Sequence, residues 1–222
     1  MWYWLLKHVF VGPLLKLLGR PEIEGLRHVP AGGPVIIAAN HLAVVDSLYL
    51  CLVLPRKVTF IAKQEYFTTG GFRGRVNRWV MNATGQVSVD RTGGRAGGDS
   101  LAAAVRILER GGVWGIHPEG TRSPDGRIYR GRTGVIRVAM QTGAPVIPVV
   151  LSGTDRMNPR HRRLLRPAKV RISIGRPRYF VPADRCGVRQ ATDELMADLV
   201  RRSGRPYVDC YAATFTERAE AA

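Results

Sequence analysis

The chain has 222 residues, enough for one sizeable hydrophobic core, and it holds no internal repeat or low-complexity linker, so we expect a single domain with extensions. Its formal net charge of +17, from 34 Lys and Arg against 17 Asp and Glu, favours anionic partners such as nucleic acid, a lipid surface or phosphorylated small molecules. The cysteines, Cys51, Cys186 and Cys210, show no paired or C-x-x-C spacing, which argues against a disulfide scaffold or structural zinc and favours a reducing, cytosol-facing compartment.

The amino-terminal segment is strongly apolar and opens with Trp2, Tyr3 and Trp4, ring types that favour the membrane–water interface. A spanning helix needs about 20 apolar residues, whereas this run is shorter and is interrupted by Lys7 and Lys16. It also lacks the cationic start and cleavage site of a signal peptide. We expect a helical segment that lies in the interface, with both lysines reaching headgroups. A true membrane span and a helix packed on its own domain remain open.

Strands and helices alternate along the rest of the chain. Runs rich in β-branched residues predict strands at 34–38, 58–62, 86–89, 113–116, 145–151 and 169–174. Helical stretches are predicted at 46–54, 73–82, 99–110 (capped by Asp99 or Ser100), 133–142 and 189–203. This alternation predicts an α/β fold with a central, mostly buried mixed sheet flanked by helices. We place the apolar segment at 1–20, the main domain at 21–205 and a less ordered C-terminal tail at 206–222.

Two ionisable residues, His41 and Asp46, stand between the apolar runs PVIIAA and LYLCLVL, where a strand leads into a helix. Active sites of open α/β sheets favour this end of the strands. Five residues of regular helix would leave the two side chains about 140° apart, so either the segment bends or His41 precedes the helix. If they meet, the carboxylate fixes the imidazole tautomer and the other ring nitrogen can take a proton from a hydroxyl. A structural His with an Asp that caps the helix stays open.

Two further polar stretches follow predicted strands. IHPEGTRS (116–123) comes directly after VWG, and VSVDR (87–91) places Arg91 just past a strand. Arginines and loop amides at strand ends can hold a phosphate, the guanidinium by two parallel hydrogen bonds. Arg91 and Arg122 therefore favour a phosphorylated ligand.

Four stretches taken together resemble a known family. NHLAVVDS (40–47), QVSVDR (86–91), HPEGTRS (117–123) and VIPV (146–149) occur in the order and approximate spacing of the four blocks of the glycerolipid acyltransferases, especially the 1-acylglycerol-3-phosphate (lysophosphatidic acid) acyltransferases. The likeness covers roughly residues 20 to 180. It implies a glycerol-3-phosphate acyltransferase-like fold and transfer of a fatty acyl group from acyl-CoA or acyl-carrier protein to a free hydroxyl of the acceptor lipid. The product would be phosphatidic acid, and no cofactor or metal is implied.

The resemblance also implies roles for individual residues. His41 would be the general base and Asp46 its partner. The other matching positions would bind the acceptor or shape its site: Asn40, Arg91, Glu119, Gly120, Thr121, Arg122 and Pro148. Two positions depart from the family's usual pattern, because His117 replaces an aromatic residue, usually Phe, and Ala43 replaces a small hydroxyl residue. Another acceptor of the same chemistry, a glycolipid or a polyol phosphate, remains an alternative.

Other chemistries are less well supported by the sequence. His117 beside Glu119 could bind a metal with His41, although no third ligand shows diagnostic spacing. Cys51 lies in an apolar run and is expected to be an inert thiol. Because no G-x-S-x-G elbow is present, direct attack within a ternary complex is simpler than an acyl-enzyme.

A basic block without any acid runs from residue 156 to 178. It contains nine Lys and Arg: Arg156, Arg160, Arg162, Arg163, Arg166, Lys169, Arg171, Arg176 and Arg178. We expect it to contact an anionic leaflet or the phosphates of CoA, and a solvated loop is the alternative. A nucleic-acid-binding module would explain the charge, but no RRM, KH, zinc-finger or basic-zipper pattern appears. We therefore expect a peripheral or monotopic protein on the cytoplasmic face of the cell membrane.

Overall fold

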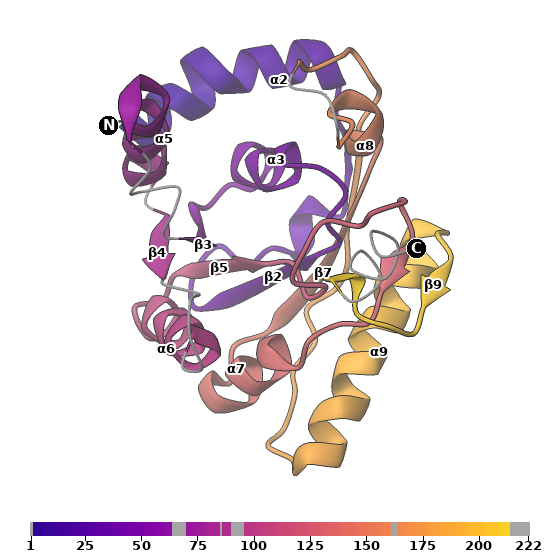
Figure 1. Cartoon of the computed structure of the whole chain (residues 1–222). Coiled ribbons are helices and arrows are strands. Elements are labelled where there is room, and N and C mark those ends of the chain that lie inside the picture. Colours follow the sequence, from indigo (N-terminus) through magenta and orange to yellow (C-terminus); the bar gives the residue numbers. More distant parts are fainter. Residues whose placement is uncertain (1, 64–69, 85, 90–95, 161–163, 214–222) are drawn as a thin grey trace.

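The computed structural model describes residues 2–63, 70–84, 86–89, 96–160 and 164–213. Within these ranges a seven-stranded sheet forms the centre of the molecule (Figure 1). In spatial order its strands are β1 (Glu22–Glu24), β8 (Arg171–Ile174), β7 (Val146–Ser152), β2 (Val35–Ala39), β5 (Val113–Ile116), β3 (Val58–Lys63) and β4 (Val87–Val89). The sheet is mixed, as predicted, because β7 and β8 are antiparallel and the other neighbours are parallel.

Burial on both faces explains why the strands read as apolar runs. Every residue of β2 is buried. Val35, Ile37 and Ala39 belong to the core on one side of the sheet, and Ile36 and Ala38 belong to the core on the other. The strands predicted from β-branched runs are therefore confirmed.

Helices cover both faces of the sheet, so the fold is the predicted α/β sandwich (Figure 1). In Figure 1, α2, α3 and α5 lie above the sheet, whereas α6, α7 and α9 lie below it. The longer helices are α2 (Val11–Gly19), α3 (Val45–Val53), α5 (Gly71–Thr84), α6 (Ala96–Glu109), α7 (Gly134–Thr142) and α9 (Arg185–Ser203). The shorter ones are α1 (Trp2–Leu5), the π-helical η1 (Leu6–Phe10), the 3-10 helix η2 (Leu26–His28) and α8 (Thr154–Met157).

The largest differences in where helices begin are in α6 and α9, which start three and four residues earlier than the sequence predicted. Helix α6 starts at Ala96, so Asp99 lies inside its first turn, where a negative charge suits the helix dipole, and does not cap it. Helix α9 starts at Arg185 because the side chain of Asp184 caps it by accepting the Gly187 N–H at 2.8 Å.

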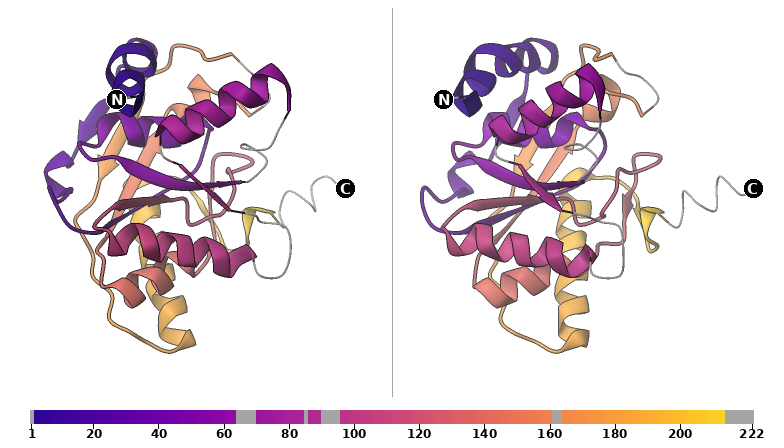
Figure 2. Two further views of the ribbon diagram at one scale, coloured as in Figure 1. Left: turned by 90° about the vertical axis from the view of Figure 1, so that its left-hand side faces the viewer. Right: turned by 60° about the vertical axis from the view of Figure 1, so that its left-hand side comes forward.

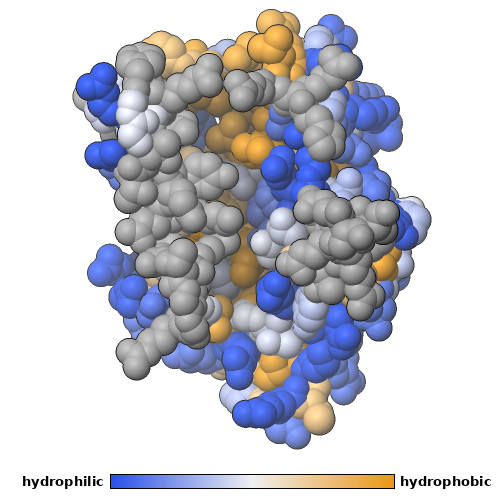
Figure 3. All heavy atoms as spheres, in the orientation of Figure 1, coloured by the Kyte–Doolittle hydropathy of each residue, from blue (hydrophilic) through white to orange (hydrophobic). Residues whose placement is uncertain are grey.

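The amino-terminal helices pack on the domain and also leave an apolar face uncovered. The Tyr3 hydroxyl donates to the Cys51 carbonyl at 3.1 Å, Lys7 Nζ donates to the Leu54 carbonyl, and Leu15 is buried. On the outer side large apolar residues are exposed: Trp2, Trp4, Val9, Phe10, Leu14 and Leu17. Apolar atoms gather along the upper edge of the molecule over these helices (Figure 3). None of the helices in the described ranges has the length and apolar character needed to cross a membrane.

The chain beyond residue 205 does not form a separate tail over its described part. Strand β9 (Tyr207–Val208) pairs in parallel with β6 (Ile128–Tyr129), and Ala212 is fully buried. The boundary predicted at 206 is therefore wrong for residues 206–213, since their backbone groups pair with a strand that lies far away in sequence. Figure 2 shows this segment beside the loops that follow β5.

Candidate active site

His41 and Asp46 meet at the carboxyl end of β2. His41 lies four residues before the first residue of α3, so the pair avoids the separation that a continuous helix would impose. His41 Nδ1 lies 3.0 Å from Asp46 Oδ2. Because a carboxylate oxygen accepts, Nδ1 carries a proton, and in the neutral imidazole the lone pair lies on Nε2. Nε2 has no hydrogen-bond partner among the residues that the structure describes, and the His41 side chain is 18% exposed.

Asp46 also bends the chain that brings the pair together. Its Oδ2 accepts the backbone N–H groups of Leu42 at 2.6 Å and Ala43 at 2.7 Å. These bonds turn the backbone back on itself between the strand and the helix. Asp46 is fully buried. Its carboxylate therefore shapes the loop as well as orienting the imidazole, and it does not act as the helix cap considered from the sequence.

The turn after β5 holds the backbone of His41 from the other side. Glu119, which is 1% exposed, accepts the His41 N–H at 3.1 Å through Oε1 and the Tyr129 N–H at 2.9 Å through Oε2. The His41 carbonyl accepts the Ser123 N–H at 2.8 Å. Burial raises the pKa of Glu119 to about 7, although the two N–H donors oppose the shift. A buried side chain with both oxygens bonded to backbone does not support the predicted contact with substrate.

His117 stacks on His41. The two ring centroids are 3.9 Å apart and the ring planes differ by 8°. His117 Nδ1 lies 3.0 Å from the carbonyl oxygens of Ala39 and Asn40, so this nitrogen donates, and Nε2 accepts from the Ser47 hydroxyl at 3.1 Å. Burial, with a smaller effect of His41, lowers the pKa of His117 to about 3, which keeps the ring neutral.

Asn40 has a structural task. Its Nδ2 donates to the Leu151 carbonyl at 3.0 Å and its Oδ1 accepts the Leu151 N–H at 2.8 Å. The side chain is fully buried. The structure therefore does not support the prediction that Asn40 binds substrate: its amide group is used to join β2 to β7.

Pro148 is buried inside the sheet opposite Ala38 of β2. Its carbonyl accepts the Gly175 N–H at 2.8 Å, while Val146 pairs with Arg178. Two residues on β7 thus oppose three on the partner segment, which is a bulge, and a bulge tolerates a proline that has no N–H to donate.

The turn that carries Gly120, Thr121 and Arg122 lies next to His41, because Glu119 and Ser123 on either side both bond to the His41 backbone. Gly120 has φ +78°, a conformation that favours glycine. Thr121 and Arg122 make no hydrogen bond or ion pair with other described residues. Arg91, the remaining predicted site residue, lies outside the described residues.

Arg132 lies across this same turn. A Cβ atom on Gly120 would come within 2.8 Å of Arg132 Nε, so a side chain at this position would displace the guanidinium from where it lies. The Arg132 guanidinium lies 5.2 Å from the centre of the Tyr211 ring, a cation–π contact supplied by the C-terminal segment. It has no carboxylate partner within the described ranges.

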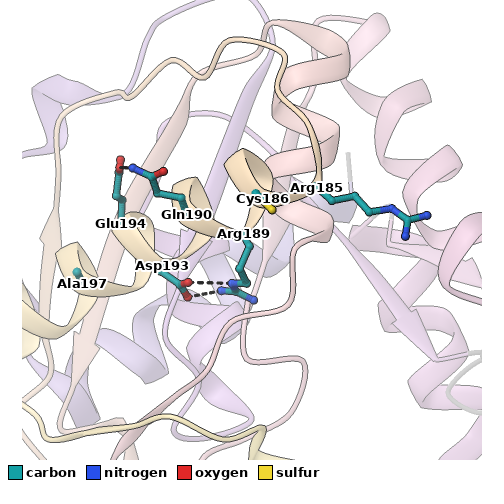
Figure 4. A pocket seen from close by; sticks show the side chains of 7 residues that line it. All are labelled: Arg185, Cys186, Arg189, Gln190, Asp193, Glu194 and Ala197. Atoms are coloured by element: carbon teal, nitrogen blue, oxygen red, sulfur yellow. Dashed lines mark hydrogen bonds and ion pairs between the residues drawn. The ribbon is translucent and has the colours of Figure 1, made fainter.

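The structure gives no support to the two alternative chemistries. Burial raises the pKa of the Cys51 thiol to about 12, so the nucleophilic thiolate is suppressed. In the part of the chain that the structure describes, no group of three His, Cys, Asp or Glu residues is placed to hold a metal ion. A shallow hollow on α9, lined among others by Arg189 and Asp193, contains none of the predicted site residues, and these two side chains pair with each other (Figure 4).

Sequence reasoning missed the interactions that join distant blocks. It singled out Glu119 and His117 but not the contacts that their side chains make with His41, 78 and 76 residues away along the chain. It assigned no role in the site to Ser47 or Tyr129. The only signal for these contacts was the position of HPEG directly after a strand, since His41 also follows directly after a strand that lies parallel to it.

Comparisons with known proteins show similarity to acyltransferases. The family described as Acyltransferase matches residues 20–152. A chloroplastic 1-acyl-sn-glycerol-3-phosphate acyltransferase of Brassica napus is 33% identical over 74% of this chain and 47% of its own length. The alpha form of the mouse enzyme of that name is 29% identical over 83% of this chain and 62% of its own length. This chain thus spans roughly half to three fifths of these relatives' length.

A solved structure has a similar fold. The crystal structure of a 1-acyl-sn-glycerophosphate acyltransferase, PlsC, from Thermotoga maritima superposes with a TM-score of 0.64 at 25% sequence identity, covering 87% of this chain and 80% of that one. The matched family region contains the His41–Asp46 pair, the Glu119 turn and Pro148, and it extends over more than half of the sequence. On this ground the chain belongs to the acyltransferase family.

Proposed function

We propose that the protein transfers a fatty acyl group from an acyl thioester to the free hydroxyl of 1-acylglycerol 3-phosphate and thereby forms phosphatidic acid for phospholipid biosynthesis. The observation that carries this proposal is the hydrogen bonding of His41: Nδ1 is bonded to Asp46, whereas Nε2 has no partner in the described ranges and is left to act as a base. The names of the Brassica napus, mouse and Thermotoga maritima relatives supply the acceptor.

In the proposed reaction, His41 is the general base. Nε2 takes the proton of the acceptor hydroxyl while the hydroxyl oxygen forms a bond to the thioester carbonyl carbon. The tetrahedral intermediate then collapses, the C–S bond breaks, and the imidazolium returns the proton to the leaving thiolate. Asp46 holds the tautomer and stabilises the imidazolium. A base placed in this way contributes on the order of 10² to 10⁴ in rate, and the reaction needs no cofactor beyond the thioester co-substrate.

The turn at Gly120–Arg122 is the proposed site for the acceptor phosphate. The Arg122 and Arg132 guanidiniums lack carboxylate partners within the described ranges, and Arg132 is held against the turn by Tyr211. Two such cations, with the N–H groups of Thr121 and Arg122, suit a phosphate dianion. Arg91 is proposed as a further phosphate ligand from its sequence block alone, and Pro148 as a residue that shapes the site through the bulge of β7.

We also propose that the protein works at the cytoplasmic face of the cell membrane as a peripheral or monotopic enzyme. The exposed apolar face of the amino-terminal helices supports this, as does the basic block. Within that block Lys169 and Arg171 pair with Glu22, and Arg178 pairs with Glu194. Four more arginines are exposed and make no ion pair with described residues: Arg156, Arg160, Arg166 and Arg176. Arg162 and Arg163 lie outside the described residues. The four arginines suit an anionic leaflet or the phosphates of CoA.

The proposed function is tested by thiol release from palmitoyl-CoA with and without lysophosphatidic acid, using the wild-type protein and His41→Ala. We expect release that depends on the acceptor and is lost in the variant. Asp46→Asn is the matched second variant, because it keeps the shape of the side chain while removing the charge that stabilises the imidazolium. Acceptor-dependent release that survives in His41→Ala would contradict the mechanism. Thiol release that depends on a glycolipid or polyol phosphate, but not on lysophosphatidic acid, would show that the acceptor belongs to one of those classes instead.

A further inference from the structure

Three sets of contacts hold the proposed base, His41, and two of them have been described above. Glu119 and Ser123 fix the His41 backbone, and Asp46 fixes the ring atom Nδ1. A single hydrogen bond at Nδ1 restrains the ring plane only loosely, because rotation about the Cβ–Cγ bond of a histidine has a broad preference. A second contact with the ring would define more narrowly where Nε2 points.

The face of His117 supplies this third constraint. Its ring lies flat against His41, with centroids 3.9 Å apart and planes 8° apart. A parallel ring at this distance blocks rotation of the His41 plane, since turning the ring would drive its edge into the neighbouring face.

His117 is itself held from three elements. Its Nδ1 donates to the carbonyls at the end of β2, and its Nε2 accepts from Ser47 in the first turn of α3. Phe60 of β3 stacks on it with centroids 5.6 Å apart and planes differing by 16°. His117 is therefore a fixed surface that cannot follow a rotation of His41.

The neutral state of His117 suits this task. His41 becomes a cation when it accepts the proton of the acceptor, and a second cation stacked on it would repel that charge. The two hydrogen-bond roles of His117 require one protonated and one unprotonated nitrogen, so the ring that faces the developing imidazolium is uncharged.

We infer that His117 is a positioning residue that fixes the plane of the His41 ring and so aims Nε2 at the acceptor hydroxyl. This inference rests on the proposed function, in which His41 is the base. It assigns a role to a position where the resemblance predicts an aromatic residue, and the shared property is a flat ring face.

Three variants test the inference by acyl-transfer kinetics with palmitoyl-CoA and lysophosphatidic acid. His117→Leu keeps apolar volume but removes the flat face, and we expect kcat to fall by about 10- to 100-fold while KM for both substrates changes by less than about threefold. His117→Phe restores a flat face and is expected to recover most of kcat. His28→Leu is the matched control, because His28 also bonds to a backbone carbonyl, that of Ile174 at 2.9 Å, but lies before β2.

The double variant His41→Ala/His117→Leu separates positioning from general damage. Without the imidazole there is nothing to aim, so the loss of His117 should not lower the residual rate any further. The inference would be overturned by an unchanged kcat in His117→Leu or by no recovery of kcat in His117→Phe. It would also be overturned if His117→Leu lowered the residual rate of His41→Ala by the same factor as it lowers the wild-type rate. If the wild-type protein transfers no acyl group, the proposed function itself is contradicted. A wild-type protein that is active but gives any of the results above contradicts only the role of His117.

Discussion

Two buried carboxylates near His41 have different surroundings. Asp46 Oδ2 accepts three hydrogen bonds, whereas Asp46 Oδ1 is buried without a partner in the described ranges. Glu119 shares two N–H donors between its two oxygens and has a pKa raised to about 7. Ionising Glu119 in the folded protein therefore costs roughly 3 kcal/mol more than in the unfolded chain.

This raised pKa predicts a stability difference that depends on pH. Between about pH 4.5 and pH 7 the folded state keeps a proton on Glu119 that the unfolded chain has lost, so the contribution of Glu119 to stability falls as the pH rises. We expect the free energy of unfolding of wild-type protein relative to Glu119→Gln to decrease by roughly 3 kcal/mol across this range, measured by urea denaturation.

Comparison with the variant is needed because His117 acts in the opposite sense. Its pKa is lowered to about 3, so stability from His117 is lost as the pH falls below about 6.5. Both proteins contain His117, and its effect cancels in the difference. Substitution of the exposed Glu24 by Gln is the control. A difference that stays constant with pH would show that folding does not raise the pKa of Glu119.

At the level of elements, the side chain of Asn40 extends β2 beyond its last strand residue. Backbone pairing between β2 and β7 ends at Ala39 opposite Val149. Two residues further along β7, the N–H and C=O of Leu151 face the Asn40 amide, which offers one acceptor and one donor. The strand end next to His41 is thus held in place after the backbone has turned away.

Asn40→Ala should therefore destabilise the fold. It leaves the buried N–H and C=O of Leu151 without partners, and we expect a loss of about 2 to 5 kcal/mol in the free energy of unfolding, measured by chemical denaturation. Asn82→Ala, at an exposed position of α5, is the control and should stay within about 0.5 kcal/mol. An equally small change in Asn40→Ala would mean that water replaces the amide.

The sequence predicted those elements whose pattern is local. The central strands are apolar on both faces and were found from their β-branched runs, and the loop from His41 to Asp46 was found from spacing. Strand β1 was missed because its three residues are exposed, and β6 and β9 were missed because each has two residues and a partner about 80 positions away. The same distance along the chain concealed the bond from Glu119 to His41.

At the level of the whole molecule, the exposed apolar face of the amino-terminal helices is combined with exposed arginines that make no ion pair with described residues. Trp4, Phe10 and Leu17 are 59%, 60% and 71% exposed. Water contact with side chains of this size is unfavourable, and lipid would cover them. The formal charge of +17 adds attraction to an anionic surface, which salt weakens.

Vesicle binding measures this proposed contact. We expect Phe10→Ser and Leu17→Ser each to weaken binding to vesicles of anionic phospholipid by about tenfold, because each removes much of one apolar side chain from the interface. Val181→Ser is the matched control, since Val181 is 78% exposed in the connection before α9. If all three variants bound the vesicles equally well, the membrane contact would lie on a face other than that of the amino-terminal helices.

Helix α3 has a consequence for lipid access. Its first turn contains Asp46, whereas Cys51 and Leu54, at and just beyond its last turn, bind Tyr3 and Lys7 of the amino-terminal helices. Tyr49 in the middle of α3 also donates to the Leu15 carbonyl of α2 at 2.8 Å, so the amino-terminal helices lie along the side of α3. With those helices seated in the headgroup layer, the width of α3 would separate that layer from the segment that carries His41. A lipid would then need to rise by one helix diameter, roughly 10 Å, for its hydroxyl to reach Nε2.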